Sequence, residues 1–226
     1  MKRIVALHGN VGGPWEWSAV EDALGLPLDK RCLWEPDALE FEPGDILLGY
    51  SLGGRLALQA AVSNPTKFSA VIAISAHPGL ITQKERDERI ASDDEWANLA
   101  RNLSWDEFLR QWDAQSVLGS SPFSRETLES YRLAIAEGFE KWGLGRQEDL
   151  RRKVKMINNR LILISGGLDL KYSKLASEVE SGLHVSIPDA GHRVHLDQPL
   201  AVAKAIRAFL ETMEGCIPAN IPHGEA

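Results

Sequence analysis

The sequence predicts an α/β fold, with a mainly parallel sheet flanked by helices and a helical insertion between its two halves. Short, continuously apolar runs alternate with helix-like segments over residues 3–75 and again over 160–213. Such runs are typical of strands buried on both faces, and their alternation with helices favours a parallel sheet. Residues 82–152 lose this pattern and carry charged, tryptophan-containing segments with helical spacing. We interpret this insertion as a small helical cap.

The length of 226 residues suits one well-buried domain and is too short for two of ordinary size. We expect a single domain over 1–226 that includes the insertion at about 82–152. Residues 215–226 contain Pro218, Pro222 and Gly224, which predicts a flexible tail.

Charge and composition exclude several classes of partner. A formal net charge of −7 disfavours nucleic acid and anionic membrane surfaces. Cys32 and Cys216 stand far apart and outside any metal-ligand spacing, so neither a disulfide framework nor a zinc site is indicated. The N-terminal apolar run is too short for a signal peptide, and no stretch of about 18 apolar residues occurs. We expect a soluble, cytoplasmic protein that binds a small molecule and needs no cofactor.

In the first half of the chain, the apolar runs predict strands at 3–7, 31–34, 45–50 and 70–75, and helices at about 15–24 and 54–62. The glycine-rich loop at 8–14 has neither the ending of a phosphate-binding P-loop nor the glycine spacing of a dinucleotide site. Nucleotide binding is therefore not indicated. His8 in this loop either shapes the turn or contacts a substrate.

In the second half, helical spacing covers residues 85–89, 94–97, 105–112 and 127–142. The tryptophans of these segments are predicted to pack the cap onto the body of the domain. The strand pattern resumes at 160–165 and 183–187, and an amphipathic helix at 200–213 closes the domain.

The chemistry is organised around Gly49-Tyr50-Ser51-Leu52-Gly53-Gly54, which lies between a predicted strand and a predicted helix. Small residues two before and two after Ser51 allow the sharp bend, called a nucleophile elbow, that presents a serine at the carboxyl edge of a parallel sheet. Ser51 is therefore a candidate nucleophile or base. The alternative is a glycine-rich turn with an incidental serine.

Two further candidates follow predicted strands, Asp169 after 160–165 and His192 after 183–187. Because the carboxyl ends of parallel strands share one edge, the three side chains should converge. His192 would accept the proton of Ser51, and Asp169 would orient the imidazole. The backbone amides of Asn10 and Leu52 are the predicted oxyanion hole.

Competing assignments exist for these residues. Asp189 is nearer to His192 in sequence, but it lies on the same loop and is poorly placed to reach the ring, so we favour Asp169. His192, His195 and Asp197 could be read as metal ligands. No other Cys/His cluster supports that reading, so we expect no metal.

More particular motifs surround the elbow. They are the stretch 49–55 with Arg55 four residues after Ser51, His77-Pro78-Gly79-Leu80, Arg86 and Arg89 ahead of Asp94 and Trp96-Ala97, and Asp169-Leu170-Lys171-Tyr172. The order of elbow, cap, acid and histidine resembles the α/β-hydrolase superfamily over essentially the whole chain. Within it, these motifs resemble the MenH family, the 2-succinyl-6-hydroxy-2,4-cyclohexadiene-1-carboxylate synthases of menaquinone biosynthesis.

The resemblance implies a substrate with several carboxylates, from which the enzyme removes a proton and expels pyruvate so that a second ring double bond forms. It implies that the serine and histidine act as a base and that no acyl-serine forms. By matching position, Tyr50 and Arg55 line the pocket, Arg89 reaches in from the cap, and Trp112 matches a cap tryptophan. Guanidinium groups suit carboxylates because they bind them in a planar, bidentate way.

The chain departs from the family's pattern in its pocket arginines. A further pocket arginine expected in the second half of the cap has no clear match, because Arg125 and Arg132 are both offset.

Two other functions fit the same residues. A carboxylesterase or thioesterase would use the triad to form an acyl-serine on neutral esters. A ligand-binding receptor would keep the fold and the triad but turn over slowly or not at all.

Overall fold

The computed structural model describes residues 2–118, 125–180 and 182–213. The predicted tail at 215–226, with Cys216, lies outside the described residues.

The strands are β1 (Ile4–Leu7), β2 (Leu28–Arg31), β3 (Ile46–Tyr50), β4 (Ala70–Ile74), β5 (Leu161–Gly166) and β6 (Leu183–Ile187). The α-helices are α1 (Ser18–Leu24), α2 (Leu52–Ser63), α3 (Gln83–Asn102), α4 (Trp105–Asp113), α5 (Arg132–Trp142), α6 (Leu170–Ser177), α7 (Val194–Asp197) and α8 (Pro199–Glu211). Short 3-10 helices join them: η1 (Pro14–Trp17), η2 (Glu126–Tyr131), η3 (Leu144–Arg146) and η4 (Lys153–Arg160).

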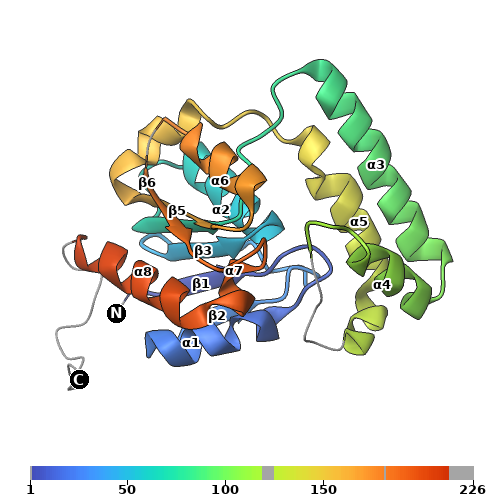
Figure 1. The fold of residues 1–226 in the computed structure, drawn as a ribbon, viewed down its shortest axis with the longest axis horizontal. Helices are drawn as coiled ribbons and strands as arrows, with labels where there is room; N and C mark the ends of the chain where they lie inside the picture. Colours follow the sequence, from blue (N-terminus) through green and yellow to red (C-terminus); the bar gives the residue numbers. More distant parts are fainter. Residues whose placement is uncertain (1, 119–124, 181, 214–226) are drawn as a thin grey trace.

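The described strands form one sheet in the order β2–β1–β3–β4–β5–β6, and every neighbouring pair is parallel (Figure 1). The central strands β1, β3, β4 and β5 are buried along their whole length. Parallel strands bring their carboxyl ends to one edge, where loops can place side chains together. The prediction of a mainly parallel sheet flanked by helices is confirmed.

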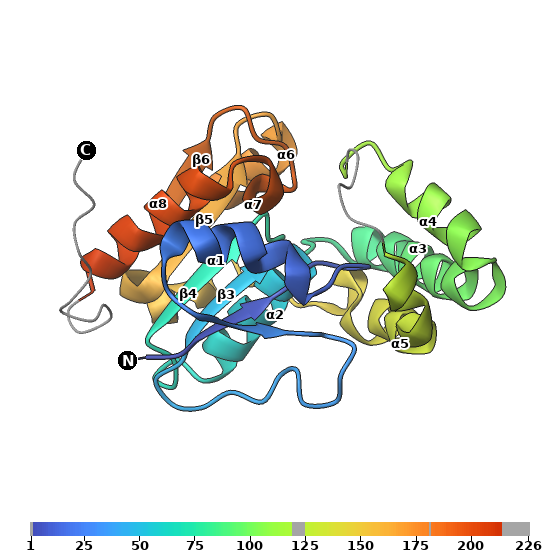
Figure 2. The same ribbon diagram turned by 90° about the horizontal axis from the view of Figure 1, so that it is seen from below.

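Helices cover both faces of the sheet. α1 and α8 pack side by side on one face, where Ile46 of β3 belongs to the same core as Val20 and Ile206 (Figure 2). α2, η4 and α6 cover the other face, where Leu47 joins the core around α2. Neighbouring residues of β3 thus point into opposite layers, which explains why this strand is apolar at successive positions.

The segment between β4 and β5 forms helices that lie together to one side of the sheet (Figures 1 and 2). We call α3, α4 and α5 the cap. α3 and α5 pack against each other and are joined by a bidentate ion pair, in which Arg101 Nη1 and Nη2 lie 2.6 and 2.7 Å from the carboxylate oxygens of Glu140. Aromatic rings of Trp96, Trp112 and Phe139 pack together inside it, 5.0 to 6.4 Å apart.

Two elements differ from the expectation. The second strand covers Leu28–Arg31, and the predicted strand at 31–34 was wrong beyond its first residue. Leu33 and Trp34 are buried because they pack in a loop, where Trp34 Nε1 donates to Gly12 O at 2.9 Å. The two charged helical segments expected at 85–89 and 94–97 belong to a single helix, α3. Thr82 and Glu85 form a capping box at its N-terminus.

No helix among residues 2–118, 125–180 and 182–213 is long and apolar enough to cross a membrane.

Candidate active site

Ser51 occupies a strained backbone position between β3 and α2, with φ of 49° and ψ of −107°. The turn is so tight that a Cβ on Gly49 would lie 2.3 Å from the carbonyl carbon of Gly53. A Cβ on Gly53 would lie 2.2 Å from the carbonyl oxygen of Leu7 on β1. Only glycine fits at these two positions, which is the physical reason for the small residues that flank the serine.

The structure brings the three triad candidates together. His192 Nδ1 lies 2.7 Å from Asp169 Oδ2, and His192 Nε2 lies 3.4 Å from Ser51 Oγ. Asp169 is fixed because it also caps α6, accepting from the backbone N–H of Tyr172 at 3.2 Å. Asp189 is exposed on its loop and forms no hydrogen bond or ion pair with the imidazole. The arrangement can pass a proton from the serine hydroxyl to a buried, oriented imidazole.

The loop after β1 lies against the serine turn. Gly53 N donates to His8 O at 3.1 Å, which ties this loop to the start of α2. The backbone amides of Asn10 and Leu52 donate to no acceptor among the described residues, and both residues line the same cavity. The predicted oxyanion-hole donors are therefore available to a bound oxygen.

His8 has a structural role. Its ring is fully buried, with Nδ1 2.7 Å from Gly9 O and Nε2 accepting from Leu33 N at 2.9 Å. These bonds place the proton on Nδ1, and burial lowers the pKa of His8, so the ring is neutral. Of the two roles that the sequence left open, the structure supports the shaping of the turn.

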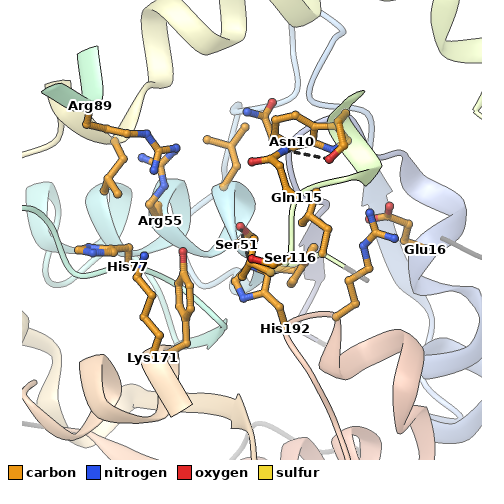
Figure 3. A pocket seen from close by; sticks show the side chains of 18 residues that line it. Asn10, Glu16, Ser51, Arg55, His77, Arg89, Gln115, Ser116, Lys171 and His192 are labelled. Carbon is orange, nitrogen blue, oxygen red and sulfur yellow. Dashed lines mark hydrogen bonds between the residues drawn. The ribbon is translucent and has the colours of Figure 1, made fainter. Parts of the chain in front are cut away.

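A cavity of about 340 Å³ lies over Ser51, between the body and the cap (Figure 3). Four cationic side chains and one carboxylate line it: Arg55, Arg89, Lys171, Arg193 and Glu16. Figure 3 shows Arg55, Arg89 and Lys171 on one side of Ser51 and Glu16 on the opposite side. The lining is therefore strongly positive in a chain whose formal net charge is −7.

Arg55 is the most unusual of these cations. Its side chain is buried, and its guanidinium donates only to neutral groups, Gln147 Oε1 at 3.0 Å and the carbonyl oxygen of Trp142 at 2.7 Å. It forms no ion pair with a carboxylate of the described residues. Burial, and then the nearby charge of Arg89, lowers the pKa of Arg55 to about 10. Arg55 is still charged at neutral pH, and no carboxylate of the described residues lies within ion-pair distance of it, although the nearby Asp93 partly offsets the lowering of its pKa.

The other predicted binding residues also reach the cavity. Arg89 of α3 donates to Asp93 Oδ1 at 2.8 Å while its side chain stays 41% exposed and lines the cavity. Trp112 of α4 forms part of the wall as well as of the aromatic core. Tyr50 is buried beneath the cavity, and burial, followed by the Glu16 carboxylate, raises the pKa of its hydroxyl.

Four charged or histidine side chains line the cavity without having been assigned a role from the sequence: Glu16, His77, Lys171 and Arg193. His77 and Lys171 lie within the motifs quoted above. His77 and Arg193 could have been found, because His77 follows β4 just beyond its carboxyl end and Arg193 adjoins His192. The position of Glu16 in the sequence, by contrast, carries no signal that it would reach the cavity. Neither Arg125 nor Arg132 lines the cavity, since Arg125 pairs with Asp113 and Arg132 donates to backbone carbonyls.

The residues considered as metal ligands have other partners. The His195 ring is buried between the rings of Trp17 and Tyr50, at centroid distances of 4.8 and 4.3 Å. Asp197 accepts from the backbone N–H of Gly191 at 2.8 Å, which holds the loop of His192. In the part of the chain that the structure describes, no group of three or more His, Cys, Asp or Glu side chains could hold a metal ion.

Comparisons with known proteins identify the family and the fold. The model of the alpha/beta hydrolase family matches residues 8–205. The 2-succinyl-6-hydroxy-2,4-cyclohexadiene-1-carboxylate synthase of Pectobacterium atrosepticum is 34% identical over 171 residues, which cover 73% of this chain and 67% of that protein. The protein of the same name from Escherichia coli O1:K1 is 33% identical over 170 residues, with the same coverage. The matched part thus spans about two thirds of these relatives.

Solved structures share the fold. A structure of MenH from S. aureus superposes with a TM-score of 0.78 at 18% identity, covering 94% of both chains. A thermophilic esterase from Thermogutta terrifontis gives a TM-score of 0.66 at 17% identity, covering 94% of this chain and 90% of that one. The chain belongs to the alpha/beta hydrolase family and, over most of its length, resembles the 2-succinyl-6-hydroxy-2,4-cyclohexadiene-1-carboxylate synthases within it.

Proposed function

We propose that this chain eliminates pyruvate from a cyclohexene that carries several carboxylates, forming 2-succinyl-6-hydroxy-2,4-cyclohexadiene-1-carboxylate in menaquinone biosynthesis. The names of the curated relatives favour this reaction. The observation that carries it is the buried, unpaired guanidinium of Arg55 beside the candidate triad.

A buried cation without a counter-ion is costly, because burial removes water and nothing replaces its charge. A site that keeps such a cation is suited to a ligand that brings the missing negative charge. Arg89, Lys171 and Arg193 add further positive charge to the same cavity. A substrate with several carboxylates would suit this lining, whereas a neutral ester would leave Arg55 without a carboxylate partner.

The proposed reaction uses the triad as a base. Ser51 and His192 together take a proton from a ring carbon, and the electrons of that C–H bond form the new ring double bond. As the diene forms, the C–O bond to the departing group breaks, and that group leaves with the electron pair as the enolate of pyruvate. The proton held by His192 is then returned, directly or through water, so that the enolate becomes pyruvate and the base is regenerated. The amides of Asn10 and Leu52 would stabilise negative charge that develops on a substrate oxygen. Asp169 keeps His192 oriented and stabilises its protonated form.

The aromatic and cationic residues have different tasks in this proposal. Trp112 and Tyr50 would bound the apolar part of the ring. Arg55 and Arg89 would bind carboxylates, which fixes the ring over Ser51. Binding energy from groups remote from the reacting carbon would in this way hold the substrate for proton removal.

A carboxylesterase is the second candidate, since the triad geometry and the fold shared with an esterase also suit it. The two candidates differ in the intermediate. An esterase forms an acyl-serine, whereas the elimination leaves Ser51 unmodified.

The test supplies the purified chain with the MenH substrate and measures pyruvate release together with the absorbance of the ring diene. We expect both to appear in equal amounts, and mass spectra of enzyme quenched during turnover to show no adduct on Ser51. Absence of pyruvate release, or an adduct on Ser51 that accumulates with the natural substrate, would reject the proposal. Rapid hydrolysis of a neutral ester with burst kinetics would favour the esterase.

A further inference from the structure

His77 lines the cavity but has no part in the triad. It follows β4 in the loop 77–80 and is 7% exposed. Its Nδ1 accepts a hydrogen bond from the backbone N–H of Gly79 at 3.1 Å. A ring nitrogen that accepts cannot carry a proton, so the proton of the neutral ring must be on Nε2. No described residue accepts from Nε2.

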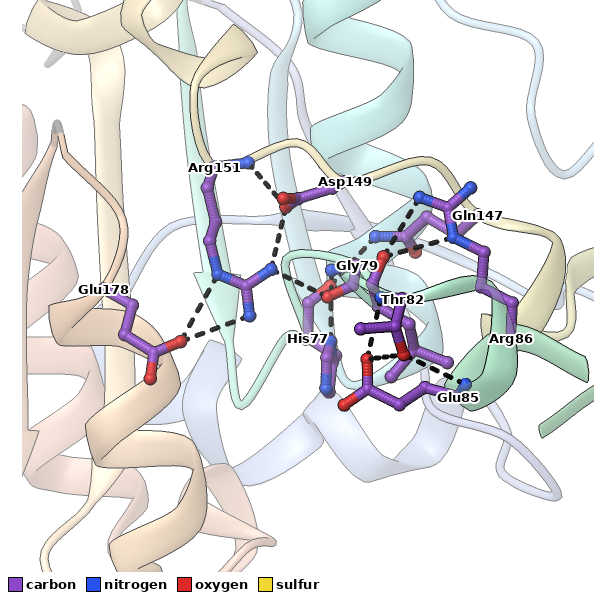
Figure 4. Close-up of polar contacts among 10 residues, drawn as sticks. His77, Gly79, Thr82, Glu85, Arg86, Gln147, Asp149, Arg151 and Glu178 are labelled. Carbon is purple, nitrogen blue, oxygen red and sulfur yellow. Dashed lines mark hydrogen bonds and ion pairs between the residues drawn. The ribbon is translucent and has the colours of Figure 1, made fainter. Parts of the chain in front are cut away.

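The loop is held rigidly by the segment that leads from the cap to η4 (Figure 4). Gln147 Nε2 donates to His77 O at 3.0 Å, Leu150 N donates to Pro78 O at 2.7 Å, and Arg151 Nη1 donates to Gly79 O at 2.9 Å.

Gly79 is required where it stands. Its φ is +122°, and a Cβ there would lie 2.4 Å from Glu148 O. The His77 ring is therefore fixed in both place and tautomer.

The surroundings keep this ring neutral. Burial is the first cause, and the positive charges of Lys171, Arg151, Arg55 and Arg89 add to it, lowering the pKa of His77 to about 3. The Tyr172 ring packs edge-on against it at 6.2 Å and adds no charge at neutral pH. On the outer side, His77, Arg89 and Lys171 also line an adjoining cavity of about 330 Å³, to which Glu85 and Glu88 contribute carboxylates.

We propose that His77 is a substrate-binding residue that donates its Nε2–H, as a neutral imidazole, to a carboxylate or carbonyl oxygen of the substrate between Arg89 and Lys171. The proposal rests on the function proposed above in taking an anionic substrate. A neutral donor adds a directed hydrogen bond where one more positive charge would repel its neighbours. It also discriminates, because a ligand that presents a donor or a methyl group at this point would leave Nε2–H unpaired.

The first test is made on the chain without substrate. Nitrogen NMR of ¹⁵N-histidine-labelled protein should show His77 with an unprotonated Nδ1 and a protonated Nε2, unchanged from about pH 5 to about pH 9. A proton on Nδ1, or an imidazole that titrates in this range, overturns the proposal. When phthalate, a ring dicarboxylate, is added as a probe and calorimetry detects its binding, the Nε2–H signal should shift. Binding without such a shift contradicts the donor role.

The second test uses His77→Phe, which keeps a ring but removes the donor, and His77→Gln, which keeps a donor near the position of Nε2. On the MenH substrate, His77→Phe should raise KM about ten- to hundredfold with a smaller change in kcat, because the bond is made to the bound substrate. His77→Gln should recover most of this loss. His184→Gln, which changes a histidine outside the cavity, is the matched control and should leave KM unchanged.

These outcomes separate the two proposals. If the wild type is inert toward the MenH substrate but binds phthalate more tightly than His77→Phe does, the proposed function fails and the donor role stands. If the wild type turns over the substrate and folded His77→Phe keeps its KM, the donor role fails and the function stands. If His77→Phe does not fold, His77→Leu takes its place. Equal increases in KM for His77→Gln and His77→Leu would then overturn the donor role.

Discussion

A serine hydroxyl becomes reactive only when a base is held close to it, and here residues of three separate segments hold the candidate base, His192. Ser75 Oγ donates to the carbonyl oxygen of His192 at 2.9 Å, and Asp197 holds the preceding residue, Gly191. Asp169 fixes the other side of the ring. The imidazole is therefore positioned by backbone contacts as well as by its carboxylate partner.

Removal of the triad groups should abolish turnover. Ser51→Ala and His192→Ala should each lower kcat for pyruvate release by about three orders of magnitude or more, because triad members act as a unit. Asp169→Asn should be nearly as severe, since an amide favours the wrong tautomer of His192. Retention of more than about a tenth of the wild-type rate by Ser51→Ala would exclude the serine from the reaction.

Removal of the cavity arginines should affect the anionic substrate selectively. Arg55→Gln and Arg89→Gln should each cost about 1.5 to 3 kcal/mol of transition-state binding, or roughly ten- to hundredfold in kcat/KM. Hydrolysis of a small neutral ester, if any occurs, should hardly change.

Arg110→Gln is the matched control for these two variants, because it removes an exposed cap arginine that pairs with Glu107 away from the cavity. Equal kcat/KM values for Arg55→Gln, Arg89→Gln and Arg110→Gln would remove the arginines from substrate binding.

The site could be predicted where a residue lies next to a strand end, and not where tertiary packing alone places it. Ser51, Asp169 and His192 each follow an apolar strand, so their convergence follows from the topology of a parallel sheet. Glu16 reaches the cavity from η1 because Gly12 leaves room beside its carboxylate, as a Cβ on Gly12 would lie 2.7 Å from it. No sequence spacing predicts such a contact.

At the scale of elements, one carboxylate joins the cap to two loops of the candidate site. Asp113, at the end of α4, pairs with Arg193 at 3.4 Å and also with Arg125. Arg193 adjoins His192, and Arg125 Nη1 donates to Val11 O at 3.5 Å in the loop after β1. Both guanidinium groups are buried, with side chains 8% and 4% exposed. Asp113 therefore links α4 to both sides of the candidate site.

Asp113→Ala should loosen this link. Two buried guanidinium groups would lose their carboxylate, which should lower the free energy of unfolding by about 1 to 3 kcal/mol. Relative to the wild type, hydrogen exchange should become faster in α4 and should change less in the sheet, because the strands do not depend on this contact. Asp106→Asn, at the other end of α4, is the control. Unchanged exchange in α4 of Asp113→Ala would show that the link does not hold the cap.

The elements themselves were predictable to different degrees. Buried strands such as β3 and β4 carry an unbroken apolar signal, and the structure places both within one residue of the expected bounds. The second strand was misplaced because Leu33 and Trp34 are apolar for packing reasons that have nothing to do with a strand. α3 was predicted in pieces because its first half is mostly exposed and charged, so only Ala97 and Ala100 near its end carry a core signal.

At the scale of the whole molecule, the distribution of charge opposes the net charge. The chain is acidic overall, yet Arg55, Arg89, Lys171 and Arg193 gather over the candidate triad. At physiological ionic strength, salt largely screens the repulsion between an anion and exposed charges more than about 8 Å away, whereas charges enclosed in a cavity are screened much less. The local cations can therefore dominate binding although the net charge is negative.

Burial of neutral histidines should make the fold sensitive to mild acid. The pKa values of His8, His77 and His184 are lowered, in each case chiefly by burial. The unfolded chain binds protons at these side chains below about pH 6.5, whereas the folded chain does not until the pH is lower. The unfolded state therefore binds more protons in this range, and stability falls as the pH falls, by up to about 1.4 kcal/mol per pH unit for each histidine.

This prediction is checked by urea unfolding at several pH values between about 6.5 and about 4.5, a window above the ordinary pKa of glutamate side chains. The wild type should lose stability across this window, and His184→Gln should show a smaller slope because one proton-binding site of the unfolded chain is gone. Carboxyl groups whose pKa is lowered in the folded chain, such as that of Glu21, reduce the stability only at lower pH. The reason is that the carboxylate of the unfolded chain stays ionised above about pH 4.5. Two results would contradict the assignment of acid sensitivity to these rings. One is a wild-type free energy of unfolding that does not change between the two pH limits, and the other is a pH slope that His184→Gln leaves unchanged.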